Sequence, residues 1–188
     1  MKHLITAAAL LLGSAAAHAQ SAHWTFSYIG FYDQEAALFM PDLRIDGSFA
    51  GNDANGDGVL EGGELTSLML GNIDYVACAS GSNAYYHCGA ERFHFSTTDG
   101  LSFSLGEYAS DPEGWRGGGY LVTTGDMSYQ YSFDPYSSSE HHLRWTEGTT
   151  LRMVSAVPEA PAWAMLLAGL GVCGLGARVR KSRALGRR

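Results

Sequence analysis

Apolar and polar residues alternate with a period of two along most of the chain between residues 24 and 153. Each short run places its apolar side chains on one face. These residues are Trp24, Phe26 and Tyr28; Leu43 and Ile45; Phe93 and Phe95; Tyr120 and Val122; Tyr129, Tyr131 and Phe133; Leu143 and Trp145; Leu151 and Met153. Such alternation is typical of strands with one buried face, so the pattern predicts an all-β domain.

Turn-forming residues separate these runs. They lie at 98–100, 111–114, 117–119, 125–126, 134–135 and 147–148. Short strands joined by short Gly-, Pro- and Asp-rich connections favour an antiparallel β-sandwich or barrel. No repeat of fixed period interrupts this organisation.

Residues 53–64, DANGDGVLEGGE, match the spacing of an EF-hand calcium loop. Gly58 at loop position 6 permits the sharp turn that such a loop makes. The expected oxygen ligands are Asp53, Asn55, Asp57, the carbonyl of Val59, Glu61 and Glu64. The sequence therefore predicts a structural Ca²⁺ site. The alternative is an Asp- and Gly-rich turn that only shares the motif.

The flanks of this loop differ from those of a complete EF-hand. Residues 43–51 alternate and contain glycine, which predicts a strand in place of the incoming helix. Residues 64–70 place Leu65, Leu68 and Met69 on one side of a helix of about two turns. We therefore expect a strand, a calcium loop and one short helix, forming a solitary calcium site on a β domain.

The N-terminus has the pattern of a secretory signal peptide. Lys2 precedes an apolar run at 4–12, and Ala17 and Ala19 form a small-x-small cleavage site. We expect a signal peptide at 1–19, cleaved between Ala19 and Gln20. The alternative, a retained membrane helix, requires a longer apolar run.

The C-terminus, 156–188, combines three features. A short proline-containing motif leads into an uncharged apolar run at 162–177, and six Arg and Lys residues follow. A helix of this length rises about 24 Å, against about 30 Å for a hydrocarbon core. The positive-inside rule places the basic end in the cytoplasm and the body outside. We therefore expect a transmembrane anchor, in preference to a helix of a soluble core.

This tail resembles the PEP-CTERM sorting signal of exported Gram-negative proteins, which an exosortase reads. The motif residues are Val157, Pro158, Glu159, Ala160 and Pro161, with Ala160 at the third motif position and the proline displaced by one. The resemblance implies an exosortase-type processing enzyme as a partner and transient anchoring in the inner membrane. It also implies delivery to the cell surface or matrix, in association with extracellular polysaccharide and biofilm.

The body between residues 20 and 155 is acidic. It contains no lysine, and its five arginines stand against eighteen Asp and Glu residues, a formal charge of −13. Such a field repels nucleic acid and anionic lipid and attracts divalent cations or a cationic partner. We therefore expect no nucleic-acid partner. A well-solvated surface on an exported protein would explain the acidic charge equally well.

Two cysteines lie in the body, Cys78 and Cys88. An oxidising compartment favours a disulfide between them. It would close a polar turn, 79–87, between two candidate strands. The alternative is a buried pair of free thiols.

The sequence shows no established catalytic motif, neither Gly-x-Ser-x-Gly nor His-Glu-x-x-His nor a phosphate loop. The side chains needed for an acid–base or transition-metal site are present in Glu140, His141, His142, His87 and His94. The sequence does not show that these residues lie close together. We therefore predict a non-enzymatic domain, and the resemblance of the tail implies a role at the cell surface or in the matrix.

Two other functions stay open. One is a secreted hydrolase that uses an acid pair with His141 or His142. The other is a carbohydrate-binding module, whose aromatic residues would otherwise be ordinary core residues. Its candidate row is drawn from Tyr85, Tyr86, Trp115, Tyr120, Tyr129, Tyr131 and Tyr136.

Overall fold

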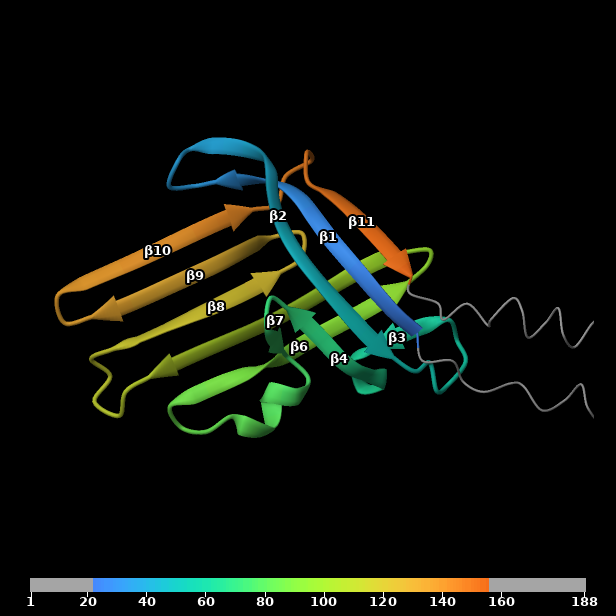
Figure 1. Cartoon of the computed structure of the whole chain (residues 1–188), viewed down its shortest axis with the longest axis horizontal. Coiled ribbons are helices and arrows are strands. Elements are labelled where there is room, and N and C mark those ends of the chain that lie inside the picture. Colours follow the sequence, from blue (N-terminus) through green and yellow to red (C-terminus); the bar gives the residue numbers. More distant parts are fainter. Residues whose placement is uncertain (1–21, 156–188) are drawn as a thin grey trace, which may run out of the picture. The chain divides into compact units, whose positions relative to one another are not determined.

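The computed structural model describes residues 22–155, which form one antiparallel β domain (Figure 1). The strands are β1 (Ala22–Asp33), β2 (Leu38–Gly51), β3 (Val59–Glu61), β4 (Leu65–Leu70), β5 (Ile73–Asp74), β6 (Tyr86–Ser96), β7 (Gly100–Ser110), β8 (Gly117–Thr123), β9 (Met127–Asp134), β10 (Ser137–Arg144) and β11 (Thr150–Ser155). Two 3₁₀ helices, η1 (Gly62–Glu64) and η2 (Ala77–Gly81), complete the elements. The predicted all-β antiparallel class is confirmed.

Several predicted segments lie outside the described residues. They are the signal peptide with its cleavage site at Ala19 and Gln20, the sorting motif from Val157 to Pro161, and the anchor helix at 162–177. Between residues 22 and 155, no helix is long and apolar enough to cross a membrane.

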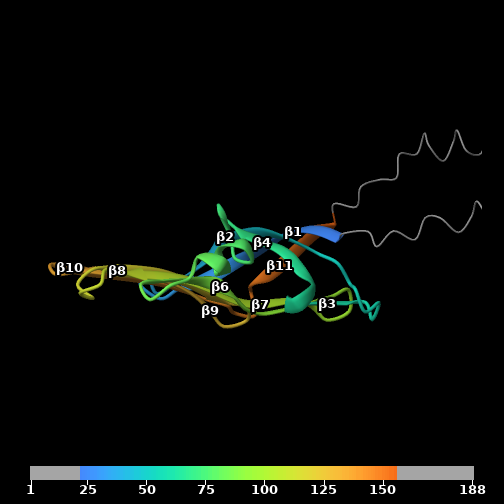
Figure 2. The same ribbon diagram turned by 90° about the horizontal axis from the view of Figure 1, so that it is seen from below.

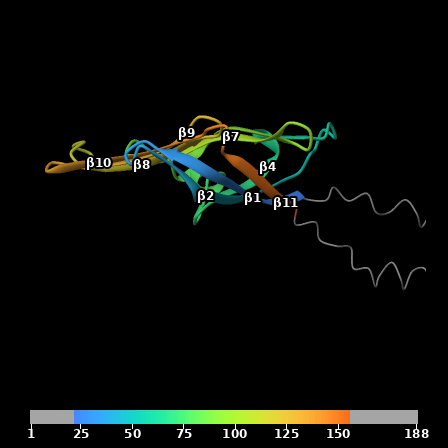
Figure 3. The same cartoon turned by 90° about the horizontal axis from the view of Figure 1, so that it is seen from above.

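The strands form a single sheet in the order β3-β6-β7-β8-β9-β10-β1-β2-β4-β5. β10 pairs with β1 only through Tyr32↔Arg144 and Asp33↔Leu143, and β11 pairs with the preceding part of β1. At this junction the sheet curls, so that a first arm (β1, β2, β4, β5, β11) lies over a second arm (β3 and β6 to β10). Figures 2 and 3 show the two layers, and the far ends of β8, β9 and β10 extending beyond them as a thin layer. The expected sandwich or barrel is thus one curled sheet.

Aromatic side chains fill the space between the arms. Phe26 in β1 lies 5.4 Å from Phe103 in β7, and Phe49 in β2 lies 5.0 Å from Phe95 in β6, measured between ring centroids. Phe49, Leu68 and Val122 are fully buried. The period-two pattern predicted the faces that carry Phe26, Phe95 and Val122, because alternate residues of a strand share a face. In β1, a register irregularity between Ile29 and Phe31, where Gly30 has a φ of +86°, lets both Tyr28 and Phe31 face the core.

The predicted short helix after the calcium loop is wrong. Only Gly62–Glu64 are helical, and Leu65–Leu70 form β4, which pairs with β2. The register shifts between Ala50 and Gly51, so that Leu65 pairs with Gly51 and Ser67 with Ala50. This bulge inserts one residue, and it places Leu65 and Leu68 on the same buried face. A bulged strand thus reproduces the three-residue spacing of a helix.

Residues 117–119 were predicted as a turn, and they begin β8 instead. The reason is their neighbour, β9. A Cβ at Gly117 would lie 2.7 Å from Cζ of Phe133, and one at Gly119 would lie 2.8 Å from Cε1 of Tyr131. The glycines therefore make room for aromatic rings within the sheet. The other predicted turn residues, from Thr98 to Gly148, lie between strands or at a strand end.

Candidate functional site

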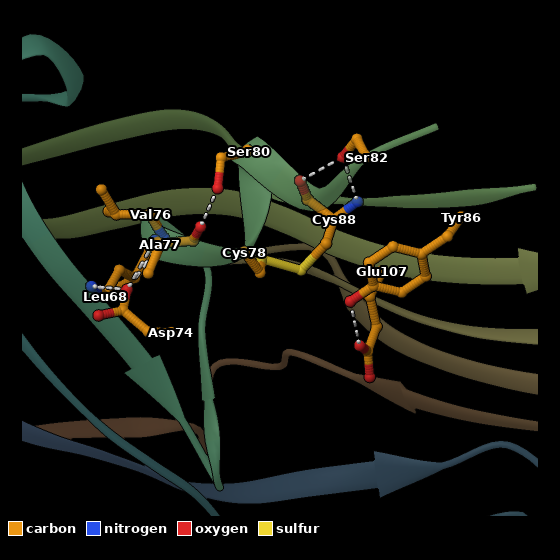
Figure 4. The surroundings of a disulfide bond; sticks show 10 residues. All are labelled: Leu68, Asp74, Val76, Ala77, Cys78, Ser80, Ser82, Tyr86, Cys88 and Glu107. Atoms are coloured by element: carbon orange, nitrogen blue, oxygen red, sulfur yellow. Dashed lines mark hydrogen bonds between the residues drawn. A yellow bond between two sulfur atoms is a disulfide. The ribbon is translucent and has the colours of Figure 1, made fainter. Parts of the chain in front are cut away.

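Cys78 and Cys88 form the predicted disulfide, with Cα atoms 5.7 Å apart (Figure 4). Cys78 lies in η2 and Cys88 in β6, so residues 79–87 do not join two strands as expected. The Ser82 hydroxyl donates a hydrogen bond to the carbonyl of Cys88 (3.1 Å) and accepts one from its N–H (3.0 Å). The bridge therefore holds η2 against β6.

Asp74 organises the chain just before this bridge. Its carboxylate accepts hydrogen bonds from the N–H groups of Leu68, Val76 and Ala77 (Figure 4). It accepts a fourth from the Ser67 hydroxyl. Burial acts to raise the pKa of Asp74, but the four hydrogen bonds act together to hold it below its ordinary value. Asp74 thus serves the fold as a carboxylate.

The calcium-loop candidate, 53–64, leaves β2 and returns through β3 and η1. Asp53 accepts hydrogen bonds from the N–H groups of Gly56 (2.7 Å), Asp57 (3.2 Å) and Gly58 (2.9 Å). Gly56 and Gly58 have φ angles of +74° and +81°, in the left-handed region that favours glycine. The N-terminal half of the loop therefore curls around the Asp53 carboxylate.

Glu64 closes the loop from its other end. One carboxylate oxygen accepts a hydrogen bond from the N–H of Ala54 (2.9 Å), and the backbone carbonyl of Glu64 accepts one from Asn52 (3.0 Å). Asn55 donates through its side-chain amide to Asp57 (3.0 Å). The structure thus brings four predicted ligands, Asp53, Asn55, Asp57 and Glu64, into one hydrogen-bonded loop.

The remaining predicted ligands lie on the strand part of the loop. Val59 and Glu61 belong to β3 and pair with Ser96 and His94 of β6. The Glu61 side chain lines a groove on the sheet with Arg92 and His94. The intervening Leu60 is buried and anchors the loop to the core. Glu61 also joins the loop, because its N–H donates a hydrogen bond to Glu64 Oε2 (3.3 Å).

The donor set of the loop fits a hard cation, because carboxylate and amide oxygens suit Ca²⁺. In this structure the oxygens accept hydrogen bonds from N–H groups of the loop. The carboxylates of the loop do not place three ligand atoms within 4.8 Å of one another. Among residues 22–155, Asp33, Glu35 and His141 form such a group.

That group belongs to a carboxylate–imidazole cluster, which we define as Asp33, Glu35, His141 and His142. Asp33 Oδ2 lies 3.1 Å from His141 Nε2, and Glu35 Oε1 lies 2.8 Å from His142 Nδ1. Asp33 ends β1, Glu35 follows it, and both histidines lie in β10. The pairing of β1 with β10 brings these elements together.

Backbone groups hold both carboxylates. The N–H of Ala36 and the ring of His141 keep the pKa of Asp33 below its ordinary value. The N–H and the ring of His142 do the same for Glu35. Sequence reasoning singled out the two histidines but named Glu140 as their neighbour. Asp33 and Glu35, more than 100 residues earlier, were missed, because nothing local in the sequence links them to the two histidines.

An aromatic strip, which we define as His142, Tyr129, Tyr131 and Phe133, lies on one face of β9 and β10. Tyr129 is 4.5 Å from His142 and 5.2 Å from Tyr131, and Phe133 is 6.4 Å from Tyr131, between ring centroids. The planes of neighbouring rings differ by 23°, 18° and 1°. All four side chains are partly exposed. The strip is thus a row of near-parallel rings.

The other members of the predicted aromatic row do not join this strip. Tyr86 and Tyr120 lie on the opposite face of the sheet, where they surround Glu107. Tyr85, Trp115 and Tyr136 are exposed on connections between strands. Two of the seven predicted aromatic residues, Tyr129 and Tyr131, therefore belong to the strip.

Comparisons with known proteins return no match: no protein-family model, no curated protein and no solved structure is found to be similar to this chain. The functional argument therefore depends on the residues and their geometry.

Proposed function

We propose that this chain is an exported, non-enzymatic protein of the cell surface or extracellular matrix, and that its β domain binds extracellular polysaccharide. The aromatic strip is the observation that carries this proposal. The acidic body, with a formal charge of −13 from five arginines and eighteen acidic residues, argues against nucleic acid as the partner.

The rings of the strip stack on one another and stay partly exposed beside polar groups, so a sugar chain would find apolar and polar contacts together. In the register of β9 and β10, Tyr131 pairs with Glu140 and Phe133 pairs with Ser138, so each ring has a polar neighbour on the same face. Glu140 and Ser138 are exposed. Rings give contact area at low cost in side-chain entropy, and the polar neighbours give hydrogen bonds to hydroxyl groups.

Export is supported by the disulfide between Cys78 and Cys88, because such bonds persist in oxidising compartments. In this proposal the segment at 1–19 directs export, the helix at 162–177 holds the protein in the inner membrane, and an exosortase-type enzyme acts at residues 157–161. Deleting residues 158–188 should then release the protein into the medium. Unchanged retention in the membrane fraction would contradict the anchor.

Calcium has a structural role in this proposal. Asp53, Asn55, Asp57 and Glu64 would hold the ion, with the Val59 carbonyl and Glu61 as the remaining expected ligands. The ion would neutralise acidic side chains that lie close together in one loop. It would also fix the connection from β2 to β3 and β4, the strands that border the core.

Binding of the full-length protein to a panel of insoluble bacterial polysaccharides tests the proposed function. Tyr131→Ala should reduce retention at least about fivefold, because a ring at an interface contributes about 1–3 kcal/mol. Tyr136→Ala is the matched control, since Tyr136 is 93% exposed and lies outside the strip. The proposal fails if no polysaccharide is retained, or if the two variants behave alike.

A further inference from the structure

We propose that Asp33, Glu35 and His141 form a binding site for a divalent transition metal of the zinc class. This site is separate from the loop at 53–64, and it does not depend on the proposed polysaccharide binding.

The three side chains offer one ligand atom each, and these atoms all lie within 4.8 Å of one another. Asp33 Oδ2 and His141 Nε2 are 3.1 Å apart. In a tetrahedral zinc site with bonds of about 2.0–2.2 Å, neighbouring ligand atoms lie roughly 3.3–3.6 Å apart. Small rotations of the three side chains therefore make room for an ion between them.

A backbone N–H group holds one oxygen of each carboxylate, and the other oxygen faces a histidine ring. Asp33 Oδ1 accepts a hydrogen bond from the N–H of Ala36 (2.9 Å), which leaves Oδ2 toward His141. Glu35 Oε2 accepts one from the N–H of His142 (2.9 Å), and Glu35 Oε1 lies 2.8 Å from His142 Nδ1. Such hydrogen bonds fix the orientation of ligands in metal sites.

The junction of the sheet fixes the positions of the residues that carry these ligands. Asp33 pairs with Leu143 of β10, and the N–H of Gln34 donates to the carbonyl of His142 (3.1 Å). The ligands thus come from two segments that the sheet holds side by side, and little of the chain has to be ordered when an ion binds.

The ligand types select the metal. A site that combines imidazole nitrogen with carboxylate oxygen suits zinc and its neighbours in the first transition row, whereas Ca²⁺ and Mg²⁺ prefer oxygen alone. His142 supplies a second imidazole, 2.8 Å from Glu35 Oε1. It either orients the Glu35 carboxylate through a hydrogen bond or takes the place of Glu35 as a metal ligand. The side chains of His141 and Glu35 are 46% and 39% exposed, so an ion reaches them from solvent.

Metal binding would bear on the neighbouring surface. The ring of His142 lies 4.5 Å from Tyr129, the first tyrosine of the aromatic strip. An ion that joins the turn after β1 to β10 would hold this end of the strip in place. The competing account of the same geometry is a pair of histidine–carboxylate ion pairs with no metal.

Isothermal titration of the full-length protein with Zn²⁺, in calcium-free buffer, separates the two accounts. We expect one Zn²⁺ per chain, and affinity at least about tenfold weaker in His141→Ala, the size of effect typical when a metal-site residue is removed. His94→Ala is the matched control, because His94 contacts a single carboxylate, Asp99, at 3.8 Å. Asp53→Ala should also keep its zinc affinity.

Cobalt absorption gives a second readout on the same proteins. Bound Co²⁺ should show the intense visible bands of a four-coordinate site, and His141→Ala should lose them while its far-ultraviolet circular dichroism stays unchanged. His141 is half exposed, so its removal leaves the fold intact for this comparison. Absence of zinc binding, or equal zinc affinity in wild type and His141→Ala, overturns the proposal.

Discussion

Tyr28 in β1 donates a hydrogen bond of 2.7 Å to the carbonyl oxygen of Leu101 in β7, 73 residues further along the chain. The two residues belong to opposite arms of the sheet, and both are buried. Burial raises the pKa of the Tyr28 phenol above its usual range, so the hydroxyl stays a donor at all ordinary pH values. This polar contact specifies how the two arms meet within an aromatic core.

Tyr28→Phe should lower the free energy of unfolding by about 1–3 kcal/mol, because the Leu101 carbonyl loses a partner inside the core. Urea titration followed by tryptophan fluorescence measures the change. Tyr108→Phe, at a tyrosine that is 46% exposed, is the control and should leave the midpoint within error. Equal midpoints for Tyr28→Phe and wild type would show that this bond does not stabilise the fold.

Reduction of the Cys78–Cys88 disulfide should destabilise the domain by about 2–3 kcal/mol. The estimate follows from the loop that the bridge closes, with a sequence separation of 10. Thermal unfolding with and without dithiothreitol measures the effect, and the Cys78→Ser, Cys88→Ser double variant is the control. The double variant should unfold at the same temperature in both buffers, close to the reduced wild type. An unchanged melting temperature on reduction of the wild type would refute this expectation.

Asp74→Asn should destabilise the fold near neutral pH by about 1–3 kcal/mol, because a charged acceptor of four hydrogen bonds is lost. The folded pKa of Asp74 lies below its ordinary value of 3.8. Its contribution is therefore complete above that pH, and it disappears as the pH falls through the folded pKa.

Unfolding free energies measured between pH 7 and pH 2 check this expectation. The wild type and Asp74→Asn should converge at the acid end, whereas Asp42→Asn, at an exposed position in β2, should follow the wild type throughout. A constant gap between wild type and Asp74→Asn across the whole pH range would be inconsistent with the assigned role.

Calcium should bind the full-length protein with a Kd of about 10⁻⁴ to 10⁻³ M, the range of extracellular sites. Asp53→Ala and Glu64→Gln should abolish the heat of binding, because these residues hold the two ends of the loop. Asp126→Asn, at an exposed acidic residue near Arg144, is the control. If the loop variants bind calcium as the wild type does, the loop is not the site.

The sequence by itself determined features whose residues act locally. The faces of the strands follow from period-two alternation, because each residue's side depends only on its neighbours. Most turns follow from Gly, Pro and Asp, which favour special backbone angles. The disulfide followed from counting, since Cys78 and Cys88 are the two cysteines of the body. The candidate calcium ligands could be named because they lie within one segment of twelve residues.

Tertiary structure alone decided what depends on distant neighbours. Leu65–Leu70 is a strand because β2 pairs with it through a bulge, and the sequence contains only the helix-like spacing of Leu65 and Leu68. Residues 117–119 are a strand because they pair with β7 and β9, and Gly117 and Gly119 leave room for the rings of Phe133 and Tyr131.

The carboxylate–imidazole cluster had no local signal, since 108 residues separate Asp33 from His141. Strand pairing brings such residues together, and the partner of a strand depends on the whole sheet, whereas alternation along a strand depends on that strand alone.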